Sequence, residues 1–419
     1  MERELTPRSL EKIRALVAAG VVCPHPLSLD IGEEVDTGRI APGVVLYPGC
    51  RIYGAGTVIA EDCRLGHEGP VTVEDCRLGP GVELKGGFFR RSVFLAKASL
   101  GMGAHVREGC LLEEEAGGAH CVGLKQTILF PFVTLGSLVN LCDCLVAGGT
   151  SRRDHSEVGS SYIHFNFTPD ADKATPSLVG DVPRGVMLNR PPVFLGGQGG
   201  MVGPVRLGFG NVVAAGSIIR RDYPEDGQLI YEAPPASRVR EYRPASYPSF
   251  RRIVENNIVY LANLAALAEW YAHVRRPFFA ALTFGDLIYE GVVELLAAAK
   301  EERLKRLAAM ADKAAQGAGE GPRRVFREGQ GFINRLFTEG APEVLRAVEP
   351  LREAFLGGLE RSIGGGKGDY LATIRSLPPA VSSRGTAWLG AVVTAFCRRV
   401  AAGMPDLGLF GDLPPSGER

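Results

Sequence analysis

The residues of this chain that could carry chemistry concentrate in one stretch, SSYIHFNFTPDADKATPSLVGD, from Ser160 to Asp181. An alternating apolar segment ends there in Asn166 and Phe167, and a polar loop with a single lysine, Lys173, follows. An amide side chain offers both a donor and an acceptor to a bound ligand. Asn is also common in turns, where its side chain bonds the backbone. From these residues alone, a ligand-binding role and a turn-capping role for Asn166 both stay open.

Two histidines close to this stretch are candidate bases. His164 alternates with Ile163 and Phe165, so we expect its side chain to point away from theirs. His155 lies ten residues upstream of Phe165. Each histidine is equally compatible with an ordinary surface or hydrogen-bonded role. Together with His120 they do not form a histidine cluster typical of metal sites, and nothing in the sequence requires a metal.

Arginine pairs are the candidate phosphate ligands. Arg152 and Arg153 stand next to glycines in GGTSRRDHSEVGSS, and Arg220 begins a second pair. Guanidinium groups suit the phosphate of a sugar phosphate, a nucleotide or coenzyme A. Solvated corners that pair with nearby acids such as Asp154 would have the same composition, so that alternative remains open.

A six-residue repeat must position these groups. In RIAPGVVLYPGCRIYGAGTVIAEDC, aliphatic residues recur every sixth position. The repeat resumes after one-residue slips and returns in VRLGFGNVVAAGSIIRRD. Its members are Ile40, Leu46, Ile52, Val58, Leu65, Val71, Leu78, Leu84, Leu207, Val213 and Ile219. A chain that turns every six residues makes a three-sided coil with one short strand per side. The repeat predicts a left-handed parallel β-helix, an exception to right-handed crossovers. A β-sandwich or a right-handed solenoid would not require period six.

The spacing of apolar residues changes after about residue 245, where they recur every three or four positions. The sequence therefore predicts a mixed architecture, in which the β-helix precedes an α-helical domain. The expected divisions are an N-terminal helix and lead-in (1–30), the β-helix (31–228), a proline-rich linker (229–248), the helical domain (249–410) and a disordered tail (411–419). Within the helical domain, KEERLKRLAAMADK resembles an exposed face of alternating charge with little functional meaning.

The bulk composition limits the partners and the compartment. The chain of 419 residues carries 47 basic and 47 acidic side chains, which argues against wholesale binding of nucleic acid or an anionic membrane. The N-terminus lacks a signal peptide's apolar core, and the longest apolar run is short for a bilayer span. Nine cysteines without a CxxC pair fit reduced thiols, so we expect a cytoplasmic protein.

From Lys125 to Asp222 the chain resembles the acetyltransferase half of the bacterial bifunctional enzyme that makes UDP-N-acetylglucosamine. YIHFNFTPDADKATPSLVGD is similar to the family's coil that ends in Cys-Asn-Tyr-Asp-Gly, its loop lysine and its Ile-Gly-Asp restart. FLGGQGGMVGPVRLGFGNVVAAGSIIRRD is similar to its last two coils, and GLKQT to a segment with a phosphate-binding lysine. The family's uridyltransferase half and the helical domain lie outside this resemblance.

The resemblance implies a site that is shared between the subunits of a homotrimer. In that site, Asn166 and Phe167 would read an amino sugar, Lys173 would reach toward the adjacent subunit, and Lys125 would meet the sugar phosphate. Acetyl-CoA would be the cosubstrate. The residues placed near it by the resemblance or by their charge are Gly197, Ala214, Ala215 and Arg220.

The chain departs from the family at the general base. Asn140, in LVNLCD, occupies the position of the family's histidine. Asn cannot accept a proton at neutral pH, so it cannot deprotonate an attacking amine. This departure puts acetyl transfer itself in doubt and leaves His155 and His164 as candidate substitutes.

Three functions remain compatible with the sequence. The first is an N-acetyltransferase-like protein that acts on an amino-sugar phosphate or nucleotide sugar and depends on substrate positioning in place of the family's histidine base. The second is a non-catalytic sugar-nucleotide-binding or regulatory protein that has lost the histidine base. The third is a scaffold whose solenoid only trimerises.

Overall fold

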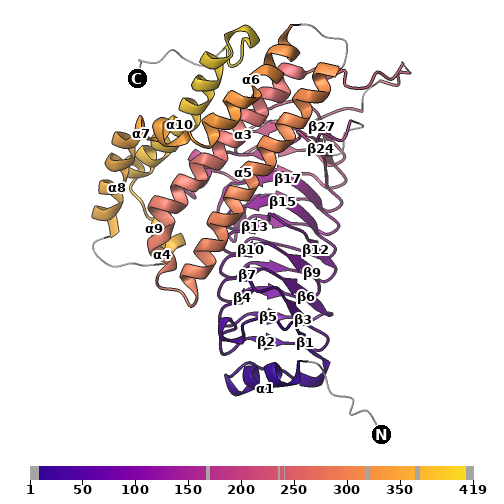
Figure 1. The fold of residues 1–419 in the computed structure, drawn as a ribbon, viewed down its shortest axis with the longest axis vertical. Helices are drawn as coiled ribbons and strands as arrows, with labels where there is room; N and C mark the ends of the chain where they lie inside the picture. Colours follow the sequence, from indigo (N-terminus) through magenta and orange to yellow (C-terminus); the bar gives the residue numbers. More distant parts are fainter. Residues whose placement is uncertain are drawn as a thin grey trace.

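The computed structural model describes residues 9–166, 170–234, 236–239, 241–316, 321–363 and 369–411. A parallel β-solenoid forms one long column, and a bundle of helices lies along its side (Figure 1). The expected architecture of a β-helix followed by a helical region is confirmed.

The strands of the solenoid line three faces, because the chain runs in the same order around every turn. Face 1 consists of β1 (Asp30–Ile31), β3 (Arg51–Tyr53), β6 (Val71–Glu74), β9 (Gly87–Arg90), β12 (Ala104–Val106), the first halves of β15 (Gly123–Leu129) and β17 (Asn140–Val146), β21 (Ile163–Phe165), β24 (Gly200–Val202) and β27 (Ile218–Ile219). Face 2 consists of β4 (Val58–Ile59), β7 (Arg77–Leu78), β10 (Val93–Phe94), β13 (Leu111–Leu112), the second halves of β15 and β17, β22 (Ser177–Val179) and β25 (Arg206–Leu207). Face 3 consists of β2 (Val45–Leu46), β5 (Arg64–Leu65), β8 (Glu83–Leu84), β11 (Ser99–Leu100), β14 (Gly117–Gly118), β16 (Thr134–Leu135), β20 (Glu157–Val158), β23 (Phe194–Leu195), β26 (Val212–Val213) and β28 (Leu229–Ile230).

One inward-pointing side chain from each two-residue strand, and more from the longer strands, fill the column, and parallel pairing keeps these side chains in register. The register corrects two members of the repeat. Ile59 rather than Val58 aligns with Leu78, and Val73 rather than Val71 aligns with Ile52. All are buried, so the apolar pattern alone could not separate them.

The corner between faces 1 and 2 explains why the repeat is ragged in the middle of the chain. At Asp75, Arg91, Gln126 and Asp143 this corner is made by one residue with a left-handed backbone, with φ between 44° and 60°. Such a corner shortens the distance between inward residues to five positions. An Asp tolerates this conformation better than most residues because its short side chain can bond locally.

Three local elements decorate the solenoid. Helix α1 (Leu10–Ala18) covers the end of the column nearest the N-terminus and buries Ile13 and Leu16 there (Figure 1). An antiparallel hairpin, β18 (Gly149–Ser151) and β19 (Asp154–His155), leaves the corner between faces 2 and 3. The short helix α2 (Val182–Gly185) leaves the same corner one turn later.

The helical region follows an extended segment and begins with α3 (Phe250–Trp270), a π-helical turn (Tyr271–Arg275) and α4 (Arg276–Phe279). The long helix α5 (Gly285–Gln316) runs back alongside α3, and the remaining helices are α6 (Pro322–Phe337), α7 (Ala341–Arg346), α8 (Glu349–Ile363), α9 (Tyr370–Arg375) and α10 (Pro379–Gly403). Within the described part of the chain, none of the helices has the length and apolar character that crossing a bilayer requires.

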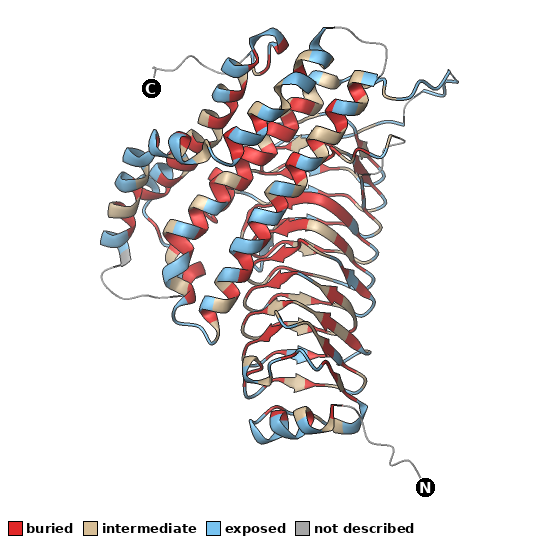
Figure 2. Cartoon of the chain, viewed as in Figure 1, coloured by how far each residue is buried: buried red, intermediate tan, exposed pale blue. Residues whose placement is uncertain are grey.

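Helices α3 and α5 cover face 2 of the solenoid. Helix α5 packs on β7 and β10, and α3 packs on β22. The outward positions of the middle strands are apolar, like the inward ones, as the pairs Val93–Phe94, Leu111–Leu112 and Ile128–Leu129 show. Strands that are buried on both sides carry such continuous apolar runs. Figure 2 shows the resulting layer of buried residues between the helices and the strands.

Polar contacts fix the helices to this face. Asn256, Asn257 and Asn263 of α3 are buried and bond backbone groups of the solenoid's loops at Pro204, Ala174 and Val182. At the π-helical turn, the Tyr271 hydroxyl donates to Glu113 at 2.5 Å, and Arg275 donates two hydrogen bonds to Glu114. Burial raises the pKa of Glu113 to about 7. The face therefore combines apolar packing with buried polar pairs that fix the register of the two parts.

Candidate functional site

The last third of face 1 presents the side chains that the sequence singled out. Ile163 and Phe165 point outward and are 41% and 40% exposed, whereas His164 between them points into the column. The expected alternation is confirmed. Asn140 lies one turn below Ile163, and its side chain is exposed on the same outer surface.

His164 is part of the solenoid's core. Its side chain is 2% exposed; its Nδ1 lies 2.5 Å from the carbonyl oxygen of Cys142 and its Nε2 lies 2.8 Å from the Ser177 hydroxyl. The Ser177 oxygen already accepts from the amide of Val205, so its own proton is available for Nε2, and Nδ1 carries the proton of the ring. Burial lowers the pKa of His164 to about 4. A neutral ring with both nitrogens bonded inside the core has no contact with a substrate on the outer surface.

Asn140 and Lys125 lie on neighbouring turns next to this core. The Asn140 amide carries no proton-accepting group of suitable basicity, and its Oδ1 is 3.8 Å from the Cys142 sulfur. The Lys125 ammonium is 2.6 Å from a carboxylate oxygen of Glu108, and this bond lowers the pKa of Glu108. The positive charge of Lys125 is therefore balanced within the chain.

Asn166 joins a buried ion pair that the sequence did not suggest. Its Nδ2 donates to Asp143 at 3.2 Å, and the other carboxylate oxygen of Asp143 lies 2.7 Å from the guanidinium of Arg303 in α5. The side chains of Asp143 and Arg303 are only 5% and 3% exposed. The expectation that KEERLKRLAAMADK is merely an exposed charged face is thus wrong at Arg303, which points from α5 into the corner between faces 1 and 2.

The loop that carries Lys173 is held against the chain's own helices. The Tyr247 hydroxyl bonds Asp172 at 2.5 Å, Asn257 bonds the carbonyl of Ala174, and Lys313 of α5 bonds the carbonyl of Asp170. Lys173 itself has a left-handed backbone, a half-buried side chain and a carbonyl 3.5 Å from Arg303. Phe167 lies outside the described residues.

The other sequence-predicted residues lie at different corners. Arg152, Arg153 and His155 belong to the hairpin between faces 2 and 3, where Arg152 bonds the carbonyls of Glu115 and Phe132. The two arginines face α9 across a cavity of about 480 Å³. These three residues are therefore separated from Asn166 by the width of face 2.

Gly197, Ala214 and Ala215 gather at the third corner, between faces 3 and 1. The turns stack closely there, since a Cβ on Gly159 would lie 2.4 Å from the backbone nitrogen of Gly197. Arg220 is exposed where β27 ends, at the corner between faces 1 and 2. The structure thus brings together Asn140, Lys125, Asn166 and Lys173. Of the proposed cosubstrate residues, it places Gly197, Ala214 and Ala215 across face 1 from them, whereas Arg220 lies at the same corner as Asn166, farther along the column.

This arrangement can bind polar ligands, but it offers little for proton transfer. Phe165 and Asn140 present a ring and an amide on the outer surface, and the amide oxygen accepts only a weak hydrogen bond from the Cys142 thiol among the described residues. The sequence pattern did not single out Phe165 as a ligand residue. Asp143 and Arg303, also missed, are engaged with each other. No group of three or more potential metal-ligating side chains occurs among the described residues.

Comparison with known proteins finds relatives that match between about a third and half of this chain. No family model matches the chain. It is 27% identical over 229 residues to bifunctional protein GlmU of Nitratidesulfovibrio vulgaris strain DP4, a match that covers 54% of this chain and 46% of that protein. The same-named proteins of Lawsonia intracellularis and Fervidobacterium nodosum are 29% identical over 130 residues and 30% identical over 143 residues. Those matches cover 31% and 34% of this chain and 24% and 28% of the relatives. The chain spans less than half the length of the curated relatives that it matches, and the resemblance inferred from the sequence is confirmed as a similarity to bifunctional protein GlmU.

Proposed function

We propose that this protein binds an amino-sugar phosphate or a nucleotide sugar of the N-acetylglucosamine type and does not perform histidine-dependent acetyl transfer. This is the non-catalytic, regulatory alternative among the functions that the sequence left open. The single observation that carries it is the exchange of roles on face 1: an amide, Asn140, faces outward, and the nearby histidine, His164, is bonded inside the core.

The outer surface of face 1 suits a sugar. A pyranose ring presents an apolar side, which an exposed aromatic ring such as Phe165 can cover, and hydroxyl or acetamido groups, which amides can bond. Asn140 offers such an amide one turn below Ile163. Asn166 would bind through the part of its amide that Asp143 does not use.

We further propose that the solenoid forms a homotrimer through its two uncovered faces. Phe194, Val212 and Leu229 are in register along face 3, and each is at least 41% exposed. Phe165 and Val202 are paired neighbours along face 1 and are exposed as well. A closed ring of identical subunits joins one patch to a different patch on the neighbour. The helices cover face 2 and leave these two patches, at the same end of the column, as the joining surfaces.

Direct binding measured beside turnover tests the proposed function. Isothermal titration with UDP-N-acetylglucosamine and with glucosamine-1-phosphate should show saturable binding that Asn140→Ala and Phe165→Ala weaken at least tenfold. Asn334→Ala, which removes an exposed amide on α6, is the matched control and should bind like the wild type. Acetyl-CoA with glucosamine-1-phosphate should give no acetylated product above the uncatalysed rate. Absence of binding by either sugar would overturn the proposal.

A second candidate is the acetyl-CoA-dependent transfer itself. It is favoured by the corner at Gly197, Ala214 and Ala215, where small residues leave the backbone edge uncovered for an extended acyl-carrying chain. Turnover in the wild type that Asn140→Ala abolishes would establish this candidate instead. Turnover that appears only in Asn140→His would show that the pocket is intact and that the base alone is missing.

A further inference from the structure

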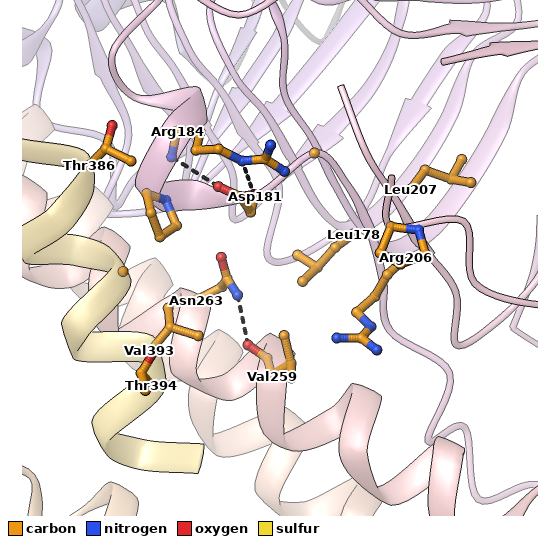
Figure 3. Close-up of a pocket in the computed structure, with 14 residues that line it drawn as sticks. Leu178, Asp181, Arg184, Arg206, Leu207, Val259, Asn263, Thr386, Val393 and Thr394 are labelled. Atoms are coloured by element: carbon orange, nitrogen blue, oxygen red, sulfur yellow. Dashed lines mark hydrogen bonds and ion pairs between the residues drawn. The ribbon is translucent and has the colours of Figure 1, made fainter. Parts of the chain in front are cut away.

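A cavity lies between the helical region and the last turns of the solenoid, away from the Asn166 corner. It has a volume of about 380 Å³, and its walls come from α3, α10, the α2 turn and the strands of face 2 (Figure 3). Cavities of a few hundred cubic ångströms at the junction of two structural units are the usual setting of small-molecule sites.

The walls are mainly apolar and carry a few polar groups. Leu178, Val259 and Val393 supply apolar surface, Leu178 from the solenoid and the two valines from the helices (Figure 3). Thr386 and Thr394 of α10 also line it. Among the hydrogen bonds of the described residues, none involves either threonine hydroxyl, so both are available to a ligand.

Two other polar residues of the wall are already satisfied. Arg184 is held by Asp181 and Asp226, each at 2.7 Å, and stacks on Phe209. Asn263 accepts from the amide of Val182 and donates to the carbonyl of Val259. These groups shape the cavity and contribute little free bonding capacity.

Arg206 is different, because part of its guanidinium has no partner. Its Nε is shielded from solvent and has no hydrogen bond, and its terminal nitrogen lies 3.6 Å from Asp222. Asp222 is shared with Arg252 and Asn256. The cavity cannot reach this shielded Nε, but the Arg206 side chain as a whole is 35% exposed and its terminal nitrogen is 3.6 Å from a shared carboxylate, so an anionic ligand would accept hydrogen bonds from the terminal nitrogens.

A second hollow of about 710 Å³ meets the first at Arg206 and has a basic lining. Arg206 lines both cavities, and Arg251 and Arg252 stand beside it at the start of α3. Glu255 and Asp222 balance two of these three arginines. One positive charge therefore remains around the second hollow, next to the positive end of a long helix dipole. Around Arg184, on the first cavity, Asp181 and Asp226 leave one negative charge in excess, so an anionic head group is expected at Arg206 and away from Arg184.

Gly390 in the middle of α10 provides an independent indication. A Cβ built on Gly390 would have no atom within 4 Å, although this glycine lines the cavity. A glycine inside a helix costs stability relative to alanine. No close contact in the structure requires glycine here, whereas a ligand in the cavity would.

We propose that the two adjoining hollows bind a small anionic amphiphile. Its carboxylate or phosphate head would accept hydrogen bonds from Arg206, and its compact apolar group would lie between α3 and α10 with the threonine hydroxyls beside it. The ligand would contact both the solenoid and the helical region and would strengthen their junction. This site does not depend on the sugar-binding function, since it shares no residue with the surface around Asn140.

Isothermal titration of the full chain with octyl phosphate and with octanoate tests the proposal. At least one of the two should bind saturably with one site per chain, and inorganic phosphate and octanol alone should bind at least tenfold more weakly. Gly390→Leu fills the apolar cavity and should weaken binding at least tenfold, as should Arg206→Gln. The matched controls are Gly357→Leu, which also adds a leucine to a helix, and Arg399→Gln, which removes a half-exposed arginine from α10.

The outcomes separate a site from nonspecific binding. Equal loss of affinity in the control variants, or unchanged affinity in Gly390→Leu, would overturn the proposal. Failure of both amphiphiles to bind would overturn it as well. Circular dichroism of each variant establishes that it is folded, and Thr394→Val, a nearly isosteric change, repeats the test if Gly390→Leu is not. If the wild-type chain binds an amphiphile but binds neither UDP-N-acetylglucosamine nor glucosamine-1-phosphate, the proposed sugar-binding function fails and the amphiphile site stands.

Discussion

Replacing Arg303 by methionine should destabilise this protein more than any other single charge removal on α5. Arg303 and Asp143 lie 2.7 Å apart, and their side chains are 3% and 5% exposed. Arg303→Met keeps most of the side-chain volume but leaves the carboxylate of Asp143 buried, with the Asn166 amide as its remaining partner among the described residues. A buried charge without its counter-ion costs about 3–5 kcal/mol.

Substitution of the partner, Asp143, tests whether the cost of Arg303→Met comes from an unpaired buried charge. Asp143→Asn should also be destabilising, since it leaves the buried guanidinium of Arg303 with only the more distant carboxylate of Glu302, at 4.0 Å, among the described residues. The double variant Asp143→Asn/Arg303→Met removes both charges, and exchange of a buried ion pair for neutral groups is often nearly neutral. We therefore expect the double variant to lose no more than about 1 kcal/mol, with a coupling energy of at least about 2 kcal/mol.

Guanidinium-induced unfolding, followed by circular dichroism at one fixed protein concentration, measures these differences. Arg306→Met is the control, because Arg306 lies one turn away in α5, pairs with Glu302 at 2.7 Å and is 25% exposed. An exposed pair of this kind contributes less than about 1 kcal/mol. If Arg303→Met costs no more than Arg306→Met, or if the double variant is as unstable as either single variant, the buried pair does not hold the corner as inferred here.

Four further predictions concern stability and assembly. The pKa of His164 is lowered to about 4 in the folded protein from an ordinary value of 6.5, so its contribution to stability is lost as the pH falls from 6.5 to 4. The difference in free energy of unfolding between the wild type and His164→Gln, measured in urea, should shrink over that range by up to about 1.4 kcal/mol per pH unit. The pKa of Glu113 is raised from 4.5 to about 7, so its contribution to stability is lost as the pH rises through that interval. The difference in free energy of unfolding between the wild type and Glu113→Gln should therefore shrink as the pH rises. Where the effects of His164 and Glu113 overlap, the stability of the wild type alone should change little with pH. Gly390→Ala should raise the thermal midpoint, with a gain of about 0.5–1 kcal/mol, because the new methyl group meets no atom and the helix gains propensity; an unchanged or lower midpoint would contradict this. Val212→Lys introduces a charge in the face 3 patch and should convert a trimer to monomers in sedimentation velocity, and a wild type that is already monomeric would refute the proposed assembly.

The solenoid could be predicted from the sequence because its pattern is local. The short strands contribute inward aliphatic residues at a regular interval, so the inward positions of Leu46 and Ile52 can be predicted without knowledge of distant residues. The interval is shortened where a left-handed corner residue such as Asp143 makes the corner, and it is lengthened where the hairpin or α2 leaves the column. That shortening depends on backbone conformation, which a hydrophobic pattern does not encode.

The placement of the helical region could have been anticipated in part. Strands whose two neighbouring residues are both apolar, such as Leu111–Leu112 and Ile128–Leu129, indicate a sheet that is covered on its outer side. The identity of the cover was not predictable, because Arg303 meets Asp143 across 160 positions of the sequence. In a helix that reads as alternating charge, no local feature distinguishes a buried arginine from an exposed one.

The candidate site shows the same limit. The alternation of Ile163, His164 and Phe165 correctly placed the imidazole opposite to its neighbours. It could not reveal that the core would accept an imidazole, which required Ser177 and the carbonyl of Cys142 at the right distances. Polar residues inside a solenoid are specified by partners on adjacent turns, and those partners are 13 and 22 positions away.

The helical cover on face 2 has a consequence for the order of folding during synthesis. The turns around Arg77 emerge from the ribosome long before Glu294, their partner on α5, has been made. Throughout that interval the nascent column carries a bare apolar stripe, and nascent chains with exposed apolar strands are prone to aggregation. Ribosome-bound chaperones would therefore be needed longest for the middle turns, and a translational pause before residue 250 would harm this protein more than one placed after α5.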